Sequence, residues 1–174
     1  SGHLCAAVHA LAAQEKPQVN QPQEAPTEQQ PFWKVKTLEA MTPAEWESLC
    51  DGCAWCCLYK LQDEDSGEVF MTSVACRLLD LKTCRCSQYV QRQSLVETCI
   101  RITPELARSL TWLPETCAYR RLAAGQDLPD WHPLLTGDRR SVHRAHASVL
   151  GRVISEHGID LDDLEAYILD TEDE

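Results

Sequence analysis

The sequence predicts a mainly α protein with a small β-hairpin, in a single irregular domain organised by a cysteine-ligated metal or cluster. Three observations lead to this fold class. Nine of the ten cysteines lie between residues 50 and 117. Helix-start signals recur along the chain, but each is followed by only a short apolar pattern. One pair of alternating segments flanks a glycine-containing loop, which is the pattern of a hairpin.

Composition divides the chain into three parts. Residues 1–31 are rich in glutamine and proline and contain no aromatic residue, so we expect a flexible, partly tag-like N-terminal arm. Cys5 lies in this arm and is interpreted as a bystander. The cysteine-cluster domain is expected over residues 32–170, followed by an acidic tail at 171–174.

The first half of the domain should contain one helix and the hairpin. Thr42 to Glu45 form a capping box with proline at the first helical position, which predicts a helix running to about Leu49. Residues 58–62 and 68–72 are expected to pair as the hairpin. One helical turn is expected at 87–92, within an otherwise irregular stretch.

The second half should be helical. Thr103 caps a helix through Leu110, and a third helix is expected from Pro114 to Gly125. Residues 128–133 should form an extended loop stiffened by proline. Apolar residues at helical spacing from Val142 to Ile154 predict a long helix that stops at Gly158 and carries His146 on its buried stripe. Asp160 should cap a last helix.

The cysteine spacing points to metal ligation. The run Cys50-x-x-Cys53-x-x-Cys56-Cys57 is a poor disulfide framework, because neighbouring thiols rarely reach disulfide geometry. Two-residue spacing instead lets a tight turn aim several thiolates at one centre, as in zinc knuckles and iron–sulfur loops. Adjacent residues splay, so one of Cys56 and Cys57 should serve a second site or point into the core.

Eight cysteines are therefore predicted as ligands of one or two centres, which could be zinc, iron or iron–sulfur clusters. The predicted metal ligands are Cys50, Cys53, Cys56, Cys57, Cys76, Cys84, Cys86 and Cys99. A secreted disulfide scaffold is disfavoured by the clustered spacing, by the length of the chain and by the lack of a recognisable export signal.

Two further residues are weak candidates for catalysis. Cys117 is either a space-filling core cysteine or a reactive thiol, whose pKa the nearby Arg120 and Arg121 would lower. His132, between Trp131 and Pro133, is either a hydrogen-bonded turn histidine or a ligand or proton shuttle beside the metal. No nucleotide-binding glycine motif and no nucleophile elbow occurs.

The net charge of −11 excludes several classes of partner. An acidic surface repels phosphate backbones and anionic lipids, so nucleic acid and membranes are not expected partners. No apolar run approaches the roughly 18–20 residues that span a bilayer. We expect a cytoplasmic protein whose acidic face could dock a basic protein partner.

The motifs resemble one known family, the YcgN-type bacterial cysteine-cluster proteins, over about residues 32–170. The resemblance rests on Phe32-Trp33, Leu49 to Cys57, Ala75 to Asp80, Trp112 to Arg120 and Leu128 to Gly137. Their C-x-x-C-x-x-C-C domain is described as zinc- or iron-chelating, which implies a cytoplasmic metal-binding protein without an assigned activity. The same segment occurs in a flagellin lysine methylase, but no methyl-donor site is recognisable here.

Several functions therefore stay open. The chain could be a metal-binding protein of unassigned activity, an iron–sulfur electron carrier, or a metal-dependent enzyme using His132 near its centre. It could also be a module whose metal shapes a surface for a partner.

Overall fold

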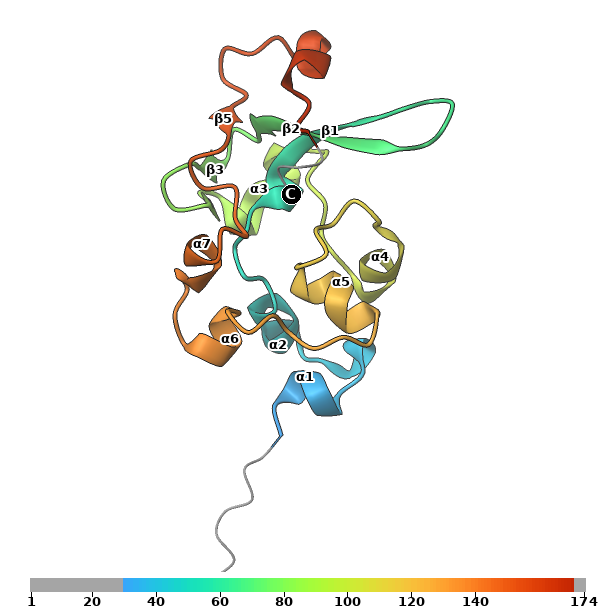
Figure 1. The fold of residues 1–174 in the computed structure, drawn as a ribbon, viewed down its shortest axis with the longest axis vertical. Helices are drawn as coiled ribbons and strands as arrows, with labels where there is room; N and C mark the ends of the chain where they lie inside the picture. The colour runs from blue at the N-terminus through green and yellow to red at the C-terminus, as the bar shows by residue number, and fades with distance from the viewer. Residues whose placement is uncertain (1–29, 171–174) are drawn as a thin grey trace, which may run out of the picture.

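A computed structural model describes residues 30–170 (Figure 1). The predictions for most of the N-terminal arm, for Cys5 and for the acidic tail fall on residues 1–29 and 171–174, which lie outside the described residues.

The described part is mainly helical, in short pieces, with a small mixed sheet. The α-helices are α1 Phe32–Val35, α2 Pro43–Ser48, α3 Arg92–Leu95, α4 Pro104–Ser109, α5 Ala118–Ala123, α6 Pro133–Thr136 and α7 Ser141–Arg144. The 3₁₀ segments are η1 Leu38–Ala40, η2 Trp55–Cys57, η3 Tyr89–Gln91 and η4 Leu161–Tyr167. In Figure 1 the sheet occupies the upper half, and α1, α2, α4, α5 and α6 the lower half.

The predicted hairpin is confirmed. Strand β1 (Leu58–Gln62) pairs antiparallel with β2 (Val69–Ala75), and β5 (Ile154–Ser155) adds to β2 in parallel. A second pair, β3 (Leu79–Asp80) with β4 (Arg85–Cys86), was not predicted. Strands of two residues are too short to show a period-two alternation in the sequence.

Two helix starts follow the predicted capping chemistry. Thr42 and Glu45 form the capping box of α2: the Glu45 amide donates to Thr42 Oγ1 at 3.2 Å, and the Thr42 amide donates to Glu45 Oε2 at 2.7 Å. Thr103 accepts from the Leu106 amide at the start of α4. The hydroxyls satisfy amides that have no partner within the helix.

The buried side chains form two clusters. One gathers around the sheet and includes Trp55, Val142 and Val149. The other lies among α4 and α5 and includes Leu49 and Tyr119. Residues 49–55 run from the second cluster into the first, so the cysteine motif lies at the junction of both.

The long helix predicted over residues 142–154 is wrong. Helix α7 ends at Arg144, and His146 takes a left-handed backbone with φ of +56° and is exposed, not buried on a stripe. The Val149 amide instead donates to the carbonyl of Cys53 at 3.0 Å. Val142 and Val149 are fully buried through this turn-rich path. Their apolar spacing reflected burial and not helical periodicity.

Two other helices also differ from the prediction. Helix α5 begins at Ala118, so Cys117 is its N-cap residue and not part of its first turn. The last element is the 3₁₀ segment η4, whose cap is Asp160 as predicted, with its carboxylate accepting from the Asp162 amide.

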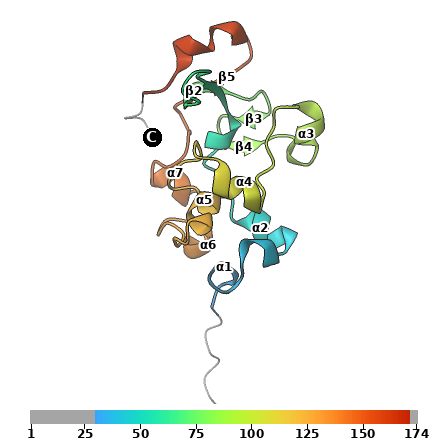
Figure 2. The same cartoon turned by 90° about the vertical axis from the view of Figure 1, so that its right-hand side faces the viewer.

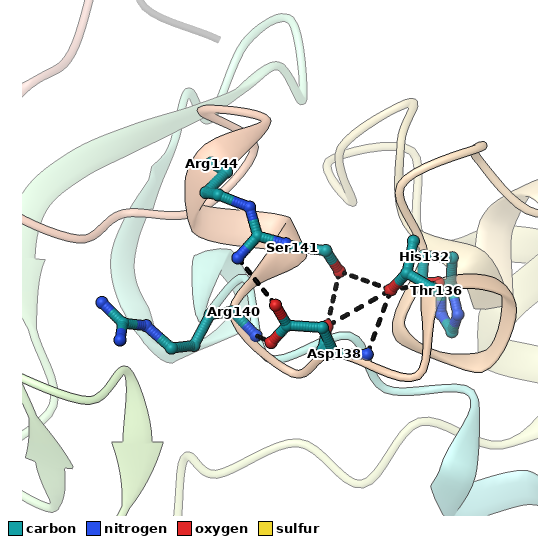
Figure 3. Close-up of polar contacts among 6 residues, drawn as sticks. All are labelled: His132, Thr136, Asp138, Arg140, Ser141 and Arg144. Carbon is teal, nitrogen blue, oxygen red and sulfur yellow. Dashed lines mark hydrogen bonds and ion pairs between the residues drawn. The ribbon is translucent and has the colours of Figure 1, made fainter.

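A polar corner joins α6 to α7 (Figure 3). The Ser141 hydroxyl donates to the carbonyl of Asp138 at 2.6 Å, and Arg144 pairs with the Asp138 carboxylate at 2.7 Å. The Thr136 hydroxyl lies 3.3 Å from the His132 carbonyl. The corner thereby ties the His132 loop to the turn that follows it.

We expect Leu49→Ala to lower the free energy of unfolding by about 2–5 kcal/mol, the range for a fully buried leucine. Leu49 has no exposed surface and belongs to the second buried cluster. Urea denaturation measures the change. Val35→Ala is the control, because Val35 is exposed and its truncation should change stability by less than about 0.5 kcal/mol. Equal effects of the two would contradict this packing.

Candidate metal centre

All nine cysteines between residues 50 and 117 are free thiols that line two adjoining cavities. The smaller cavity, of about 110 Å³, is lined by Cys50, Cys53, Cys56, Cys57, Cys84, Cys86 and Cys117. The larger, of about 310 Å³, is lined by Cys50, Cys56, Cys57, Cys76, Cys86 and Cys99. All eight predicted ligands, and Cys117 with them, therefore line the walls of these two cavities.

The first cysteines are presented by a tight turn that follows α2. Gly52, with φ of +82°, takes a conformation that favours glycine. A Cβ at this position would lie 2.9 Å from the Arg85 guanidinium carbon, which packs against the turn. The amide of Cys53 donates to Asp51 Oδ1 at 2.8 Å. Segment η2 then carries Cys56 and Cys57 to the start of β1.

Distant segments hold this turn in place. His132 Nδ1 accepts from the Leu134 amide at 3.1 Å, so Nε2 carries the proton and donates to the Leu49 carbonyl at 3.0 Å. On the other side the Trp55 indole donates to the Ala147 carbonyl at 3.0 Å. The interpretation of His132 as a hydrogen-bonded turn histidine is confirmed, since it is fully buried and both ring nitrogens have backbone partners.

Four thiols that line the smaller cavity form a quartet: Cys50, Cys53, Cys56 and Cys117. Burial, followed by the charges of Cys56 and Asp51, raises the pKa of Cys50 to about 12. Burial also raises the pKa of Cys53, and the charges of Asp51, Cys56, Cys50 and Cys117 contribute. Within this quartet the charge of Cys56 acts on the other three thiols, and the charge of Cys117 acts on Cys50 and Cys53. Bringing several thiolates together without a cation is therefore unfavourable.

The adjacent Cys56 and Cys57 lie on the wall shared by the two cavities. Their thiols share a hydrogen bond, which together with Lys60 lowers the pKa of Cys56 to about 7 and raises that of Cys57. The charge of Cys76 also raises the pKa of Cys57. One member of the pair thus faces the quartet, and the other connects to the second group of thiols.

The second group consists of Cys57, Cys76, Cys86 and Cys99, which come from four separate segments. Burial raises the pKa of Cys99, Arg92 opposes this effect, and the charges of Cys76, Cys56 and Cys86 add to it. The Cys76 amide donates to the Cys57 carbonyl at 2.9 Å, which fixes two of these segments against each other. All four are half-buried.

Cys84 stands apart from both groups, although it was predicted as a ligand. Burial raises the pKa of Cys84, and the charges acting on it come from Arg85 and Asp80, with no thiol among them. Its side chain is buried in the first apolar cluster. The backbone at Cys84 is left-handed, with φ of +52°.

Cys117 is buried, which agrees with its interpretation as a core cysteine and not with the alternative of a reactive thiol. Burial is the largest cause raising the pKa of this thiol, to about 11, and it outweighs the nearby helix amides. A readily ionised nucleophile is therefore not what this site provides. Cys117 was not among the ligands predicted from the sequence. Its place in the quartet depends on how α5 packs.

Cys50 and Cys56 combine deep burial with accessible surface. Both residues are exposed, yet burial is the leading cause of the raised pKa of Cys50. The two facts agree because both residues line the cavities, so their accessible surface opens into an internal space.

The thiols surround space and do not meet at a point. Within residues 30–170, no three His, Cys, Asp or Glu side chains converge as a site for a single metal ion. In a four-thiolate zinc site the sulfurs lie about 2.3 Å from the ion and hence roughly 4 Å from one another. No such group of side chains occurs among the described residues.

Two buried side-chain atoms have no hydrogen-bond partner within residues 30–170, Trp33 Nε1 and Asp51 Oδ2, and the second belongs to a residue that lines the smaller cavity. Asp51 is buried and lines the smaller cavity, and its Oδ2 makes no hydrogen bond there. Burial raises the pKa of this carboxyl group. An unsatisfied buried oxygen is costly, so its presence on a thiol-lined wall is typical of a site that holds a bound group.

Comparison with known proteins identifies the class to which this site belongs. Residues 49–118 match the family described as "CxxCxxCC: Putative zinc- or iron-chelating domain". The match extends from Leu49 through Cys117 and so includes every cysteine that lines the two cavities. The family description names both metals and does not choose between them.

The chain belongs to the UPF0260 family. It is 57% identical over 141 residues to a UPF0260 protein of Cellvibrio japonicus, covering 81% of this chain and 96% of that protein. A relative from Rhizobium meliloti is 55% identical over 80% of this chain and 90% of its own length. One from Azotobacter vinelandii is 54% identical over 80% and 94%. The resemblance drawn from the motifs is confirmed. No solved structure matches the chain.

Among residues 30–170, no helix is long and apolar enough to cross a membrane.

We expect His132→Phe to destabilise the protein by about 2–5 kcal/mol, because two buried backbone groups, at Leu49 and Leu134, lose their partners at roughly 1–3 kcal/mol each. Thermal or urea unfolding measures the loss. His157→Phe is the matched control, since His157 is exposed. A loss below about 1 kcal/mol for His132→Phe would show that the turn does not depend on this anchor.

Proposed function

We propose that this chain is a cytoplasmic iron–sulfur protein that holds two cysteine-ligated centres and carries single electrons. One observation carries the proposal: nine free thiols line two adjoining cavities and surround volume instead of converging on points. A reducing cytoplasm suits nine unpaired cysteines, because free thiols persist there.

The quartet Cys50, Cys53, Cys56 and Cys117 would hold the first centre. These thiols border the smaller cavity and influence one another's ionisation. The donor set fits a metal centre chemically, because soft thiolates suit zinc and iron–sulfur clusters alike. A bound cation would also offset the burial and the repulsion that raise the pKa of Cys50, Cys53 and Cys117, since coordination deprotonates a thiol.

The second centre would be held by Cys57, Cys76, Cys86 and Cys99, which border the larger cavity. Cys84 is then the cysteine left over, because its neighbours are an arginine and an aspartate and not other thiols. The spacing predicted Cys84 as a ligand, and this assignment replaces it with Cys117. The other seven ligands are the same.

The distribution of the thiols around two cavities, with no converging group of three among the described residues, favours a cluster over single zinc ions. A cluster contains several iron and sulfide atoms and takes its four thiolates around a volume. When bound, it supplies a one-electron couple. The chain's own residues would hold it, limit water access at the buried quartet, and fix the turn through Leu49 and Cys53.

An enzyme that uses His132 as its base is not favoured. Both ring nitrogens are bonded to backbone groups, and burial lowers the pKa of this imidazole. A histidine held in this way has no free position from which to move a proton to or from a substrate.

The test is anaerobic purification of the full chain, followed by iron, zinc and acid-labile sulfide analysis and a visible spectrum on one sample. We expect iron and sulfide in comparable amounts, with broad visible absorbance that bleaches on reduction. Stoichiometric zinc in a colourless protein would overturn the redox proposal and leave a structural metal scaffold.

The ligand assignment is tested by two matched substitutions. Cys117→Ala should remove about half of the iron and sulfide, because one of two centres loses a ligand. Cys84→Ala should leave both contents unchanged. Cys84 and Cys117 are both buried, so a general packing defect would affect the two variants alike. The reverse pattern would restore the assignment predicted from spacing.

A further inference from the structure

The larger cavity is lined by positive charge, although the chain is acidic overall. Its charged lining residues are Lys60, Arg92, Arg101 and Glu47, three cations against one carboxylate. The whole chain has 27 acidic and 16 basic residues. Within residues 30–170, none of these three cations forms an ion pair with a carboxylate. No carboxylate in that range therefore neutralises them, although Lys60 lies close enough to Cys56 to lower the pKa of that thiol.

The three cations occupy different depths. Lys60 is half-buried, donates to the carbonyls of Cys56 and Leu58 at 3.1 and 2.6 Å, and lies 4.2 Å from the centre of the Trp112 ring. The Arg92 guanidinium stacks 3.8 Å above the Tyr89 ring, nearer the surface. Arg101 is exposed. Positive charge thus runs from the thiols outward.

Exposed apolar side chains occur in residues 89–100, a segment that also contributes to the lining of the larger cavity. Val90 is 95% exposed, and Tyr89, Leu95 and Ile100 are 45%, 43% and 40% exposed. Tyr89 and Ile100 line the larger cavity, and Ile100 follows the half-buried Cys99. Figure 2 shows α3, which ends at Leu95, at the edge of the molecule beside the β3–β4 hairpin. We call these four residues with Arg92 and Arg101 the α3 face.

We propose that the α3 face docks an acidic electron-transfer protein, which exchanges electrons with the second centre through the segment around Cys99. This rests on the proposed function. Apolar side chains ringed by unpaired arginines fit a partner whose contact surface is apolar with an acidic rim. The inference reverses the expectation from net charge, which pointed to a basic partner.

Two small oxidants of opposite charge test whether positive charge steers an oxidant to the second centre. The full chain is reduced anaerobically with dithionite and mixed with ferricyanide, which takes one electron from the reduced centre as its iron(III) becomes iron(II). Hexaammineruthenium(III) is the cationic counterpart. We expect the ferricyanide rate constant to fall with ionic strength and the ruthenium rate constant to rise, because local positive charge governs access. A chain of net charge −11 acting as a whole would give the opposite slopes.

The variant Arg92→Glu/Arg101→Glu should reverse both slopes. Arg139→Glu/Arg140→Glu changes the net charge by the same amount at exposed arginines that line neither cavity, and should leave the sign of each slope unchanged. Iron and sulfide contents of both variants show whether the centres are intact.

Docking is tested with Val90→Ser and an acidic flavodoxin as the oxidant, measured by stopped flow. We expect a several-fold lower rate with flavodoxin and an unchanged rate with ferricyanide, because an apolar contact matters only to a protein partner. Equal flavodoxin rates for the wild-type chain and for Val90→Ser would overturn the docking face. Light scattering that shows a dimer lost in Val90→Ser would assign the face to a second copy and also overturn it.

The outcomes separate this inference from the proposed function. A colourless protein that dithionite does not reduce would overturn both. A reducible centre whose ferricyanide rate rises with ionic strength would keep the iron–sulfur proposal and overturn the α3 face.

Discussion

The structure depends on how the backbone from Leu49 to Cys57 is held. This stretch presents four cysteines, yet it is mostly turn and has little regular secondary structure to pair its polar groups. Its partners come from far along the chain: His132 donates to Leu49, and Val149 donates to Cys53. Buried backbone groups need such partners. The second half of the chain therefore serves largely to hold the turn that carries the thiols.

This constraint explains where sequence reasoning succeeded. The α2 capping box and the β1–β2 hairpin were predicted because their signals are local: a hydroxyl three residues before a glutamate, and alternation around a glycine loop. The spacing of the first four cysteines is likewise a local property of one turn, and the metal ligation that it indicates stays a prediction. The family resemblance was recognised from short motifs in the sequence.

The same constraint explains where it failed. Val142 and Val149 have helical spacing, but the hydrogen bond from Val149 to Cys53 holds this segment in turns. No local signal reports a partner almost a hundred residues away. The place of Cys117 beside Cys50 and Cys53 was missed for the same reason, since it depends on the packing of α5. The ligand role of Cys84 stays a prediction, because Cys-x-Cys spacing shows proximity along the chain and not the direction of each thiol.

The position of Cys56 and Cys57 on a shared wall has a consequence for how the chain can change in length. One peptide bond joins Cys56 to Cys57, and both residues line the two cavities. A residue inserted between them would turn one thiol away and disturb both cavities. The exposed loop from Asp63 to Glu68 touches neither cavity. Loops of this kind tolerate insertions and deletions. The protein thus combines a stretch of fixed length with a nearby loop whose length is free to vary.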